Sequence, residues 1–363
     1  MSLLHEMNDK ALMHGVPLSV HMDVTYRCNE RCGHCYLDHE DHGEMTTGEI
    51  KGILDQLAAA GTFFLTFSGG EVFLRRDFLE LVAYARKLLF NVKIKTNAVM
   101  IREREASELR RLGVEQVQIS IYSHRAEVHD GITRLPGSLA KSIRAIRFLK
   151  AQGLKVTIAN VLMRDNFADY KGTQQLAQEL GVHYTIDPTV TPKMDGDRSV
   201  LGLRVLGESL PEVFHDESLV GDVAAYCAPP PAPGDDILDG YPCSAGHTSC
   251  YITPYAEVFP CVQFPIVCGN LRRQAFEEIW RDAPQFHDVR GIRARDLTTC
   301  SGCGHVGTCS RCPGLAYMEG DMRGPSTADC EKSFYRTGIP SENMRRRGLA
   351  GAVAGLVQIS AAG

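Results

Sequence analysis

The stretch LSVHMDVTYRCNERCGHCYLD, residues 18–38, joins a β-rich run to a loop that carries three cysteines. Five more β-rich runs follow before residue 191, and periodic segments rich in Ala, Leu, Glu and Arg separate them. Strands that alternate with helices at this spacing predict right-handed βαβ units and a parallel sheet. The further runs are FFLTFSG, VKIKTN, VEQVQISIY, LKVTIANVL and VHYTIDPT, and the expected helices span residues 46–60, 76–90, 102–112, 138–152 and 167–180.

The expected helices carry start and stop signals. Short polar side chains satisfy free backbone N–H groups at a helix start, and glycine commonly ends a helix. The plausible N-caps are Thr46 or Thr47, Ser138 and Asn166, and the glycines at expected helix ends are Gly61, Gly113, Gly153 and Gly181.

Polar or Gly-rich features follow the first four expected strands. The three cysteines follow the first strand, SGGE the second and TNA the third, while SIYS closes the fourth. Six βα units are compatible with an open sheet or with a barrel, and in both architectures ligands gather at the carboxyl ends of the strands. We therefore expect the functional site at this edge.

Composition narrows the class of protein. The chain has 363 residues, 44% of them hydrophobic, and a net charge of -5, which favours one large domain plus a smaller one. No basic patch favours nucleic acid as a main partner, and no apolar run approaches the roughly 18 residues of a membrane span. The N-terminus lacks the apolar core of a signal peptide, so we expect a cytoplasmic protein. The C-terminal GLAGAVAGLVQISAAG is expected to be a frayed tail or a short docking helix.

Thirteen cysteines in a chain without an export signal indicate metal binding or catalysis rather than disulfides. Three of them lie at positions 28 to 35 and ten lie beyond position 226. The first group could form a zinc site if His34, His39 or His42 supplied a fourth ligand. Three thiolates on one loop could instead hold three irons of a [4Fe–4S] cluster and leave the fourth iron open.

The segment CNERCGHC matches the Cys-x3-Cys-x2-Cys signature of the radical S-adenosylmethionine (SAM) enzymes, and the chain resembles that family. The resemblance implies an α/β fold, a partial (β/α)6 TIM-like barrel. It implies that Cys28, Cys32 and Cys35 hold a cluster whose fourth iron is chelated by the amino and carboxylate groups of SAM. An electron from the cluster would then cleave SAM, and the 5′-deoxyadenosyl radical would abstract a hydrogen atom from the substrate.

Other stretches agree with the same family. SGGE resembles its Gly-Gly-Glu motif, in which Gly69 and Gly70 would let the backbone approach the ligand and Glu71 would receive the methionine amino group. HDGITRLPGS resembles the loop whose arginine, here Arg134, meets the SAM carboxylate; a solvated loop arginine is the alternative. The resemblance also places around SAM the residues His34, near the adenine, Thr96, Asn97, Ser120 and, at the ribose or adenine, Asn160.

The C-terminal cysteines fall in CSAGHTSCYITPYAEVFPC, then CSGCGHVGTCSRC, then Cys330. Paired Cys-x2-Cys spacings are typical of metal sites, but the spacing does not separate zinc from iron–sulfur. The region resembles the SPASM extension of radical SAM peptide-modifying enzymes, which carries two auxiliary [4Fe–4S] clusters, so three clusters are implied in all. The implied ligands are Cys243, Cys250, Cys261 and Cys312 for the inner cluster and Cys300, Cys303, Cys309 and Cys330 for the outer one.

The chain departs from the SPASM pattern at two places. Ala256 stands where the family has Gly, at a backbone angle that we expect to cost little, and the last spacing of the quartet is one residue shorter. Relatives vary at the position of Cys250, and some leave that iron open. The spare cysteines Cys227 and Cys268 are expected to be small buried hydrophobes, although either could replace Cys250.

The resemblance suggests boundaries for five segments. These are an N-terminal segment at 1–16, the radical SAM partial barrel at 17–190, a linker at 191–242, the SPASM domain at 243–335 and a tail at 336–363.

We expect a radical SAM/SPASM enzyme that acts on a peptide or protein, most simply a ribosomally made precursor peptide. Sulfatase maturases place an Asp where this chain has Val262, which disfavours formylglycine formation, while a cofactor or haem-biosynthesis enzyme and a non-enzymatic iron–sulfur electron carrier remain alternatives. About two dozen residues precede the signature, so a leader-binding module would be a separate protein, as for the pyrroloquinoline quinone maturase. The implied electron donor is a flavodoxin or ferredoxin.

Some polar residues beyond the expected strand ends are candidates to face the substrate. They are Tyr122, Asp187 and the loop TPKMDGDRS, although ordinary loop polarity is the simpler interpretation.

Overall fold

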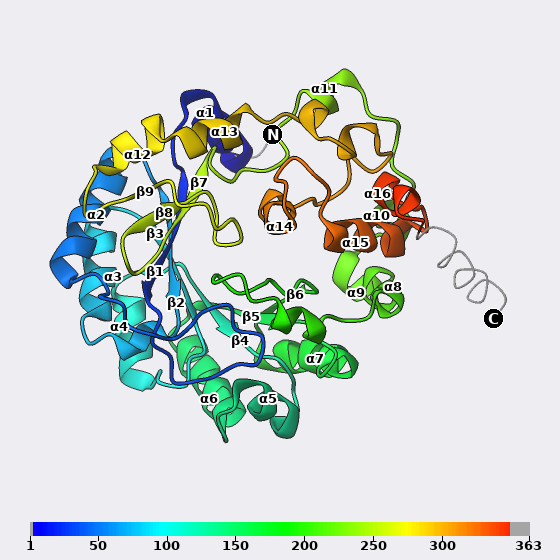
Figure 1. Cartoon of the computed structure of the whole chain (residues 1–363). Helices are drawn as coiled ribbons and strands as arrows, with labels where there is room; N and C mark the ends of the chain where they lie inside the picture. The colour runs from blue at the N-terminus through cyan, green and yellow to red at the C-terminus, as the bar shows by residue number, and fades with distance from the viewer. Residues whose placement is uncertain (1–2, 349–363) are drawn as a thin grey trace. The chain divides into compact units, whose positions relative to one another are not determined.

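The computed structural model describes residues 3–348 and contains one nine-stranded sheet, in the order β6-β5-β4-β3-β2-β1-β7-β8-β9. Strands β1 to β6 are parallel and neighbour one another in chain order (Figure 1). The order is linear, so the sheet is not closed, and the predicted α/β fold with a partial barrel is confirmed. These strands are β1 (Ser19–Thr25), β2 (Phe64–Gly69), β3 (Asn91–Thr96), β4 (Gln116–Ser120), β5 (Lys155–Val161) and β6 (His183–Asp187).

Three strands from the cysteine-rich half of the chain extend this sheet beyond β1. Strand β7 (Ser249–Ile252) pairs parallel with β1, and β8 (Glu257–Phe259) and β9 (Gly269–Asn270) continue antiparallel. Between β7 and β8, Ala256 is fully buried with φ 67°. The expectation of an inexpensive backbone angle is therefore wrong, because the left-handed region costs a residue with a Cβ about 1–2 kcal/mol.

The chain divides into two compact units, each made of separate stretches. Unit 1 comprises residues 1–204 and 245–289, and unit 2 comprises residues 205–244 and 290–363. The expected five-segment boundaries stay predictions. The helices in the stretches of unit 1 are α1 (Leu3–His14), α2 (Thr47–Ala59), α3 (Phe78–Lys87), α4 (Glu103–Arg111), α5 (Ala126–Thr133), α6 (Ser138–Ala151), α7 (Tyr170–Leu180), α12 (Phe276–Asp282) and α13 (Pro284–Gly291), whose last two residues fall in unit 2; those of unit 2 are α8 (Leu210–Phe214), α9 (Glu217–Val220), α10 (Val223–Tyr226), α11 (Asp235–Leu238), α14 (Pro313–Met318), α15 (Thr327–Thr337) and α16 (Glu342–Arg346).

The helix signals are largely confirmed. Thr46 caps α2 in a reciprocal capping box with Glu49, and Gly181 ends α7 in the left-handed conformation. Asn166 caps only a short 3₁₀ turn, Phe167–Asp169, before α7.

The structure corrects the sequence prediction in the segment 126–138. We read HDGITRLPGS as a loop, but its first half belongs to helix α5, whose last residue is Thr133. Ser138 is not the N-cap of α6, because Gly137 occupies that position. The Asp130 carboxylate takes over the capping role, accepting hydrogen bonds from the Gly137 and Leu139 backbone N–H groups. The cap therefore comes from the preceding helix, which the local sequence of α6 does not reveal.

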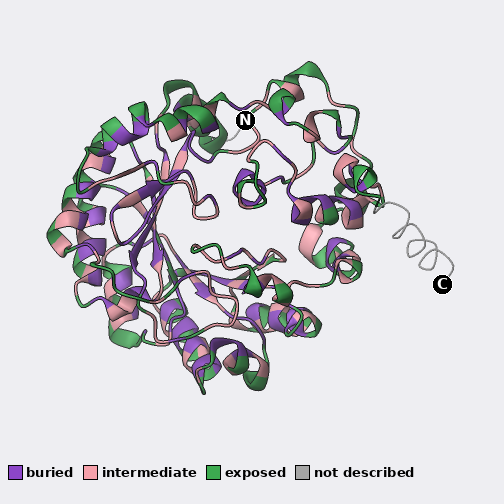
Figure 2. Cartoon of the chain, viewed as in Figure 1, coloured by how far each residue is buried: buried purple, intermediate pink, exposed green. Residues whose placement is uncertain are grey.

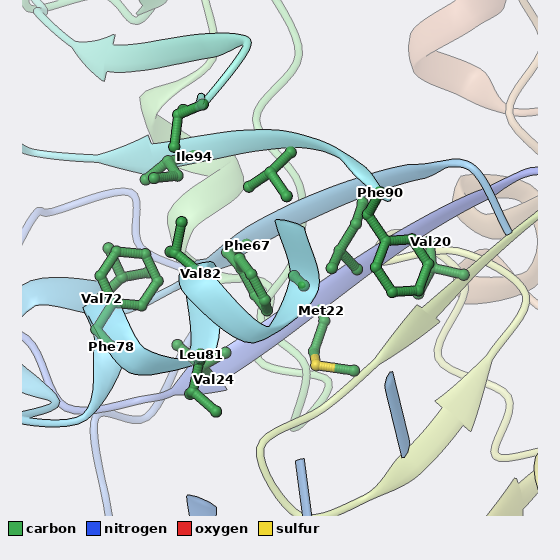
Figure 3. Close-up of a cluster of buried hydrophobic side chains, with 14 of the residues drawn as sticks. Val20, Met22, Val24, Phe67, Val72, Phe78, Leu81, Val82, Phe90 and Ile94 are labelled. Carbon is green, nitrogen blue, oxygen red and sulfur yellow. The ribbon is translucent and has the colours of Figure 1, made fainter. Parts of the chain in front are cut away.

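The main core lies between one face of the sheet and the helices that cover it. In β1, Val20, Met22 and Val24 are fully buried and gather with Phe67 of β2 and Phe78 of α3 (Figure 3). Burying each such side chain stabilises the fold by about 1.5–3 kcal/mol. Figure 2 shows the strands as mainly buried and the outer sides of the helices as exposed. The alternate residues of β1 therefore project from the other face of the sheet, where the candidate site lies.

None of the helices described between residues 3 and 348 is both long enough and apolar enough to cross a membrane. The predicted C-terminal tail or docking helix falls almost entirely beyond residue 348, outside the described residues.

Candidate functional site

A cavity of about 590 Å³ opens at the carboxyl ends of the parallel strands of unit 1. The loop that carries the three cysteines forms one wall, and the ends of β2, β3, β4 and β5 supply others. The structure thus brings together most of the predicted site. Among the predicted residues, the cavity is lined by Cys28, Cys32, His34, Cys35, Gly69, Gly70, Thr96, Asn97, Ser120 and Asn160.

The two glycines of SGGE fix the position of the cysteine loop. The Gly70 backbone N–H donates to the Thr25 carbonyl oxygen at 2.8 Å, and the Glu71 N–H donates to the Arg27 carbonyl oxygen at 2.9 Å. A Cβ added to Gly69 or Gly70 would collide with these carbonyl oxygens. We expected the glycines to admit a ligand; in the structure their first consequence is the close approach of two backbone segments.

Glu71 does not line the cavity, and its side chain is completely buried. One carboxylate oxygen accepts hydrogen bonds from the Phe73 backbone N–H at 3.0 Å and the Thr96 hydroxyl at 2.8 Å. The other accepts from the Asn97 backbone N–H at 2.9 Å and from the same hydroxyl at 2.8 Å. Burial raises the pKa of Glu71, while these donors favour its ionised form. Glu71 therefore ties the end of β2 to the end of β3.

The three N-terminal thiols are half-buried in a setting that disfavours the free thiolate. Burial, together with neighbouring acids and thiols, raises the pKa of Cys28 to about 12 and that of Cys32 further. Yet Cys28 Sγ has donors directed at it, the Glu30 backbone N–H at 3.4 Å and Asn97 Nδ2 at 3.8 Å. Thiolates next to each other become favourable once cations are present between them, and hydrogen bonds to sulfur are typical of iron–sulfur ligands. This donor set fits an iron–sulfur cluster.

A single metal ion fits less well. Within the described residues, no three His, Cys, Asp or Glu side chains are close enough together to hold one ion. Neither cysteine region is therefore arranged as a preformed zinc site.

His34 presents a neutral aromatic ring to the cavity. Burial lowers its pKa to about 4, and its ring packs edge-on against Tyr122 with centroids 4.8 Å apart. Its Nδ1 atom is buried and has no hydrogen-bond partner among the described residues. These features suit contact with a nucleobase, the role that the family resemblance implies.

Arg134 and Asn160 lie in different settings. Arg134 follows α5 with φ 55°, is exposed and does not line the cavity, although its guanidinium lies beside Gly33 of the cysteine loop. The cysteine loop is bonded to this helix end, since the Gly33 N–H donates to the Ile132 carbonyl oxygen at 3.1 Å. Asn160 does line the cavity, with its amide bonded to the Tyr184 hydroxyl at 3.0 Å.

The outer cysteine quartet comes together in unit 2, around a separate cavity of about 290 Å³. Three of its sulfur atoms receive protein donors: Cys309 from the Ser333 hydroxyl at 3.3 Å, Cys303 from a backbone N–H at 3.5 Å and Cys330 from an Asn side chain at 3.7 Å. Burial raises the pKa of the fourth thiol, Cys300, to about 11, and the other three thiols add to this shift through charge repulsion. The donors and the mutual repulsion again fit a cluster better than four free thiols.

The four cysteines predicted to hold the inner auxiliary cluster are divided between the two units. Cys243 and Cys312 lie in unit 2, and Cys250 and Cys261 lie in unit 1. Cys312 Sγ accepts a hydrogen bond from the Leu315 backbone N–H at 3.5 Å. Cys250 is buried in the hydrophobic core of unit 1.

The two cysteines that belong to none of the predicted clusters lie in different settings. Cys268 is buried in the core of unit 1, as expected of a small hydrophobe. Cys227 is only half-buried and its thiol contacts the Phe214 carbonyl oxygen at 3.5 Å.

The sequence missed several cavity residues that lie within strands rather than after them. His21, Lys95 and Gln118 line the cavity from β1, β3 and β4. The missed signal is the alternation of apolar and polar residues in VKIKT and QVQIS, because a parallel strand buried on both faces is apolar throughout. Tyr122 and Asp187, for which we preferred ordinary loop polarity, also line the cavity, as do Thr191, Val262 and Gln263.

Comparison with known proteins agrees with this geometry. Residues 22–177 match the profile of the Radical SAM superfamily, and residues 243–313 match that of SPASM, an iron-sulfur cluster-binding domain. The chain is 30% identical to the AdoMet-dependent heme synthase of Oleidesulfovibrio alaskensis over 320 residues, which cover 80% of this chain and 81% of that one. It is 31% identical to the mycofactocin maturase MftC of Mycobacterium tuberculosis over 307 residues, 81% of this chain and 77% of that one.

The fold is shared with a solved structure. SuiB of Streptococcus suis, crystallised with S-adenosylmethionine, superposes with a TM-score of 0.72 at 17% identity, over 90% of this chain and 80% of that one. The chain belongs to the radical SAM superfamily and is a radical SAM enzyme that carries a SPASM iron-sulfur cluster-binding domain.

Proposed function

We propose that this enzyme reductively cleaves SAM and abstracts a hydrogen atom from a peptide or protein, most simply a ribosomally made precursor peptide. The observation that carries the proposal is the shared cavity of Cys28, Cys32 and Cys35 with the ends of four strands. A [4Fe–4S] cluster held by these cysteines would supply the electron that converts SAM to the 5′-deoxyadenosyl radical. The cavity walls would hold SAM and the substrate against each other.

The chain's own residues would position SAM. The backbone of Gly69 and Gly70 would face its methionine end, and Glu71 would act by holding this turn against Thr96 and Asn97. His34 would contact the adenine as an uncharged ring. The remaining proposed contacts are those of Ser120, Asn160 and, from the edge of the cysteine loop, Arg134.

Two auxiliary clusters would complete a set of three. Convergence of Cys300, Cys303, Cys309 and Cys330 on one cavity supports the outer cluster. The proposed inner ligands are Cys243, Cys250, Cys261 and Cys312. Burial of Cys250 in the apolar core makes it the member that the structure supports least, which favours the variant of the family with one iron open.

A peptide substrate is supported by the similarity to the maturase MftC. A separate leader-binding protein and a flavodoxin or ferredoxin electron donor belong to this proposal. A cytoplasmic location also belongs to it, because such clusters are oxygen-sensitive and need low-potential electrons. Val262, beside Cys261, lines the cavity and offers no carboxylate, which disfavours formylglycine formation.

A tetrapyrrole substrate is the second candidate. It is favoured by the 30% identity to an AdoMet-dependent heme synthase.

One experiment tests the enzymatic proposal. The anaerobically reconstituted protein receives SAM and dithionite, and 5′-deoxyadenosine is measured with and without candidate substrates. Formation of 5′-deoxyadenosine with about twelve irons per chain would support it. No 5′-deoxyadenosine above the level of a Cys28→Ser variant, or zinc in place of iron, would refute it. Stimulation by a candidate precursor peptide, rather than by a tetrapyrrole, would support the peptide substrate.

A further inference from the structure

The interior of the partial barrel in unit 1 is an open polar space. Below the cavity of the cysteine loop lies a second cavity of about 490 Å³, and the two share the lining residues Lys95, Gln118 and Thr185. A closed (β/α)8 barrel fills this space with layers of branched apolar side chains. Here most of the residues of β3 to β6 that line the second cavity are polar, and they include Lys93, Gln116, Thr157 and His183. The space can therefore admit part of a ligand.

Lys95 is the one lysine or arginine among the described residues that line the larger cavity. Its ammonium forms no hydrogen bond with residues 3–348, and no carboxylate of that range lies within 4 Å of it. The two carboxylates whose charges act on Lys95 are otherwise engaged: Asp23 accepts from the Tyr251 hydroxyl at 2.7 Å, and Asp187 accepts from a backbone N–H at 2.8 Å. Removal from water lowers the pKa of Lys95, although Asp23, Cys261 and Asp187 oppose this shift.

Three side chains with uncharged hydrogen-bonding groups line the larger cavity together with Lys95. Gln118 and Thr185 line both cavities beside it. His21 lines the larger cavity and is held by Asp23 Oδ1 at 3.1 Å. Of these three, the Gln118 amide can donate to a carboxylate, because the Thr185 hydroxyl already donates to the Ile158 carbonyl oxygen at 3.2 Å and the His21 ring donates to Asp23. Binding of a carboxylate would also satisfy the charge of the ammonium.

We propose that Lys95 binds a carboxylate of the substrate, so that the substrate of this enzyme is an acidic molecule whose carboxylate reaches into the barrel. This inference rests on the proposed function, because it assigns a chemical class to the substrate of the same site. Lys95 is a specificity-determining residue in this scheme and takes no part in the cleavage of SAM.

The position of Lys95 also limits where the substrate reacts. Two residues further along the chain, Asn97 Nδ2 contacts Cys28 Sγ at 3.8 Å. Two residues of a strand span about 7 Å, the length of a few covalent bonds. Lys95 and the cysteine loop therefore border the same cavity, in which the substrate would lie.

The matched variants are Lys95→Met, which keeps the length of the side chain without its charge, and Lys93→Met. Lys93 lies two residues earlier on the same strand and lines only the smaller cavity. A general electrostatic effect would appear in both variants, whereas a specific contact would appear only in Lys95→Met. Lys95→Arg, which keeps the charge, should restore part of the binding.

The probes are a synthetic peptide with acidic side chains and a free C-terminus, and protoporphyrin IX, each as the free acid and with its carboxylates converted to amides or methyl esters. Binding to the SAM-loaded holoenzyme is measured by isothermal titration calorimetry. Capping the carboxylates should weaken binding to the wild type about 10- to 100-fold, as should Lys95→Met, whereas capping should change little once Lys95 is absent. The probe that shows this pattern identifies the source of the carboxylate.

The outcomes separate the two proposals. Formation of 5′-deoxyadenosine by the wild type without substrate reports SAM cleavage alone. If that activity is present but acid and capped probes bind equally, or if Lys93→Met has the same effect as Lys95→Met, the carboxylate site is refuted. Failure of both free acids to bind the wild type below about 1 mM would refute it as well. Absence of 5′-deoxyadenosine from the wild type would instead refute the proposed function.

Discussion

Replacing Glu71 with Gln is expected to destabilise the fold as well as SAM binding, because Glu71 is a structural tie. Its two oxygens accept from the backbone N–H groups of Phe73 and Asn97 at 3.0 and 2.9 Å, and both accept from the Thr96 hydroxyl at 2.8 Å. Gln offers only one oxygen and carries an amino group in place of the other. Whichever way the amide is turned, one of the two backbone N–H groups faces a second donor.

The magnitude follows from that geometry. A buried backbone N–H without an acceptor costs about 1–3 kcal/mol, and the remaining bonds lose charge assistance worth about 1 kcal/mol. A neutral amide is easier to bury than a carboxylate, which offsets part of the loss. The net expectation is a free energy of unfolding lower by about 2 kcal/mol, equivalent to about 2–3 °C in the unfolding temperature of a chain of 363 residues.

The unfolding temperature is measured by far-ultraviolet circular dichroism on the anaerobic holoenzyme at one scan rate, because cluster loss makes unfolding irreversible. Glu80→Gln is the matched control. Glu80 lies on α3, 58% exposed, and pairs with Lys51 at the surface, so its loss should cost less than about 0.5 kcal/mol. Equal unfolding temperatures for the two variants would refute the structural role. A loss of SAM affinity at unchanged stability would instead indicate that the carboxylate contacts SAM directly.

Three further substitutions each have one expected effect that a single measurement can check. Cys261→Ser should lower the iron content and change the electron paramagnetic resonance signals of the reduced protein, whereas Cys227→Ser, which alters a half-buried thiol outside both proposed cluster sets, should leave both as in the wild type. Ser333→Ala removes the hydroxyl that donates to Cys309 at 3.3 Å and should make one cluster potential more negative by about 20–60 mV in a redox titration. Burial lowers the pKa of His129 from 6.5 to about 4, so the unfolded chain takes up a proton that the folded chain resists, and stability present above pH 6.5 is lost as the pH falls toward 4. His129→Asn should therefore reduce the loss of stability between about pH 7.5 and 5.5 by about 1 kcal/mol, and an unchanged slope would contradict the assignment.

The sequence was sufficient for the sheet and for the edge at which the site lies. Short polar motifs after successive strands predict a common site, since parallel strands end at the same edge. Their backbone details were not predictable. Gly69 and Gly70 serve the contact with the cysteine loop, and Asp130 caps a helix from outside it. Both features depend on residues distant in sequence or in another element.

Ala256 shows a different limit of sequence reasoning. Its departure from the family Gly was visible, but its φ of 67° depends on the turn between β7 and β8. The methyl group is completely buried there, so removal of its apolar surface from water offsets part of the backbone strain. Neither the strain nor the burial of Ala256 follows from the pattern of residues around it.

The alternation of apolar and polar residues within the strands is a signal that the short motifs do not contain. In β3, Val92 and Ile94 are fully buried, while Lys93 and Lys95, which alternate with them, face the open interior. A central parallel strand covered on both faces would bury all four, and two lysines there would each need a partner. The alternation therefore distinguishes a barrel with an open polar interior from one with a packed interior. The same alternation places Lys95 in that interior, where the proposed carboxylate site lies.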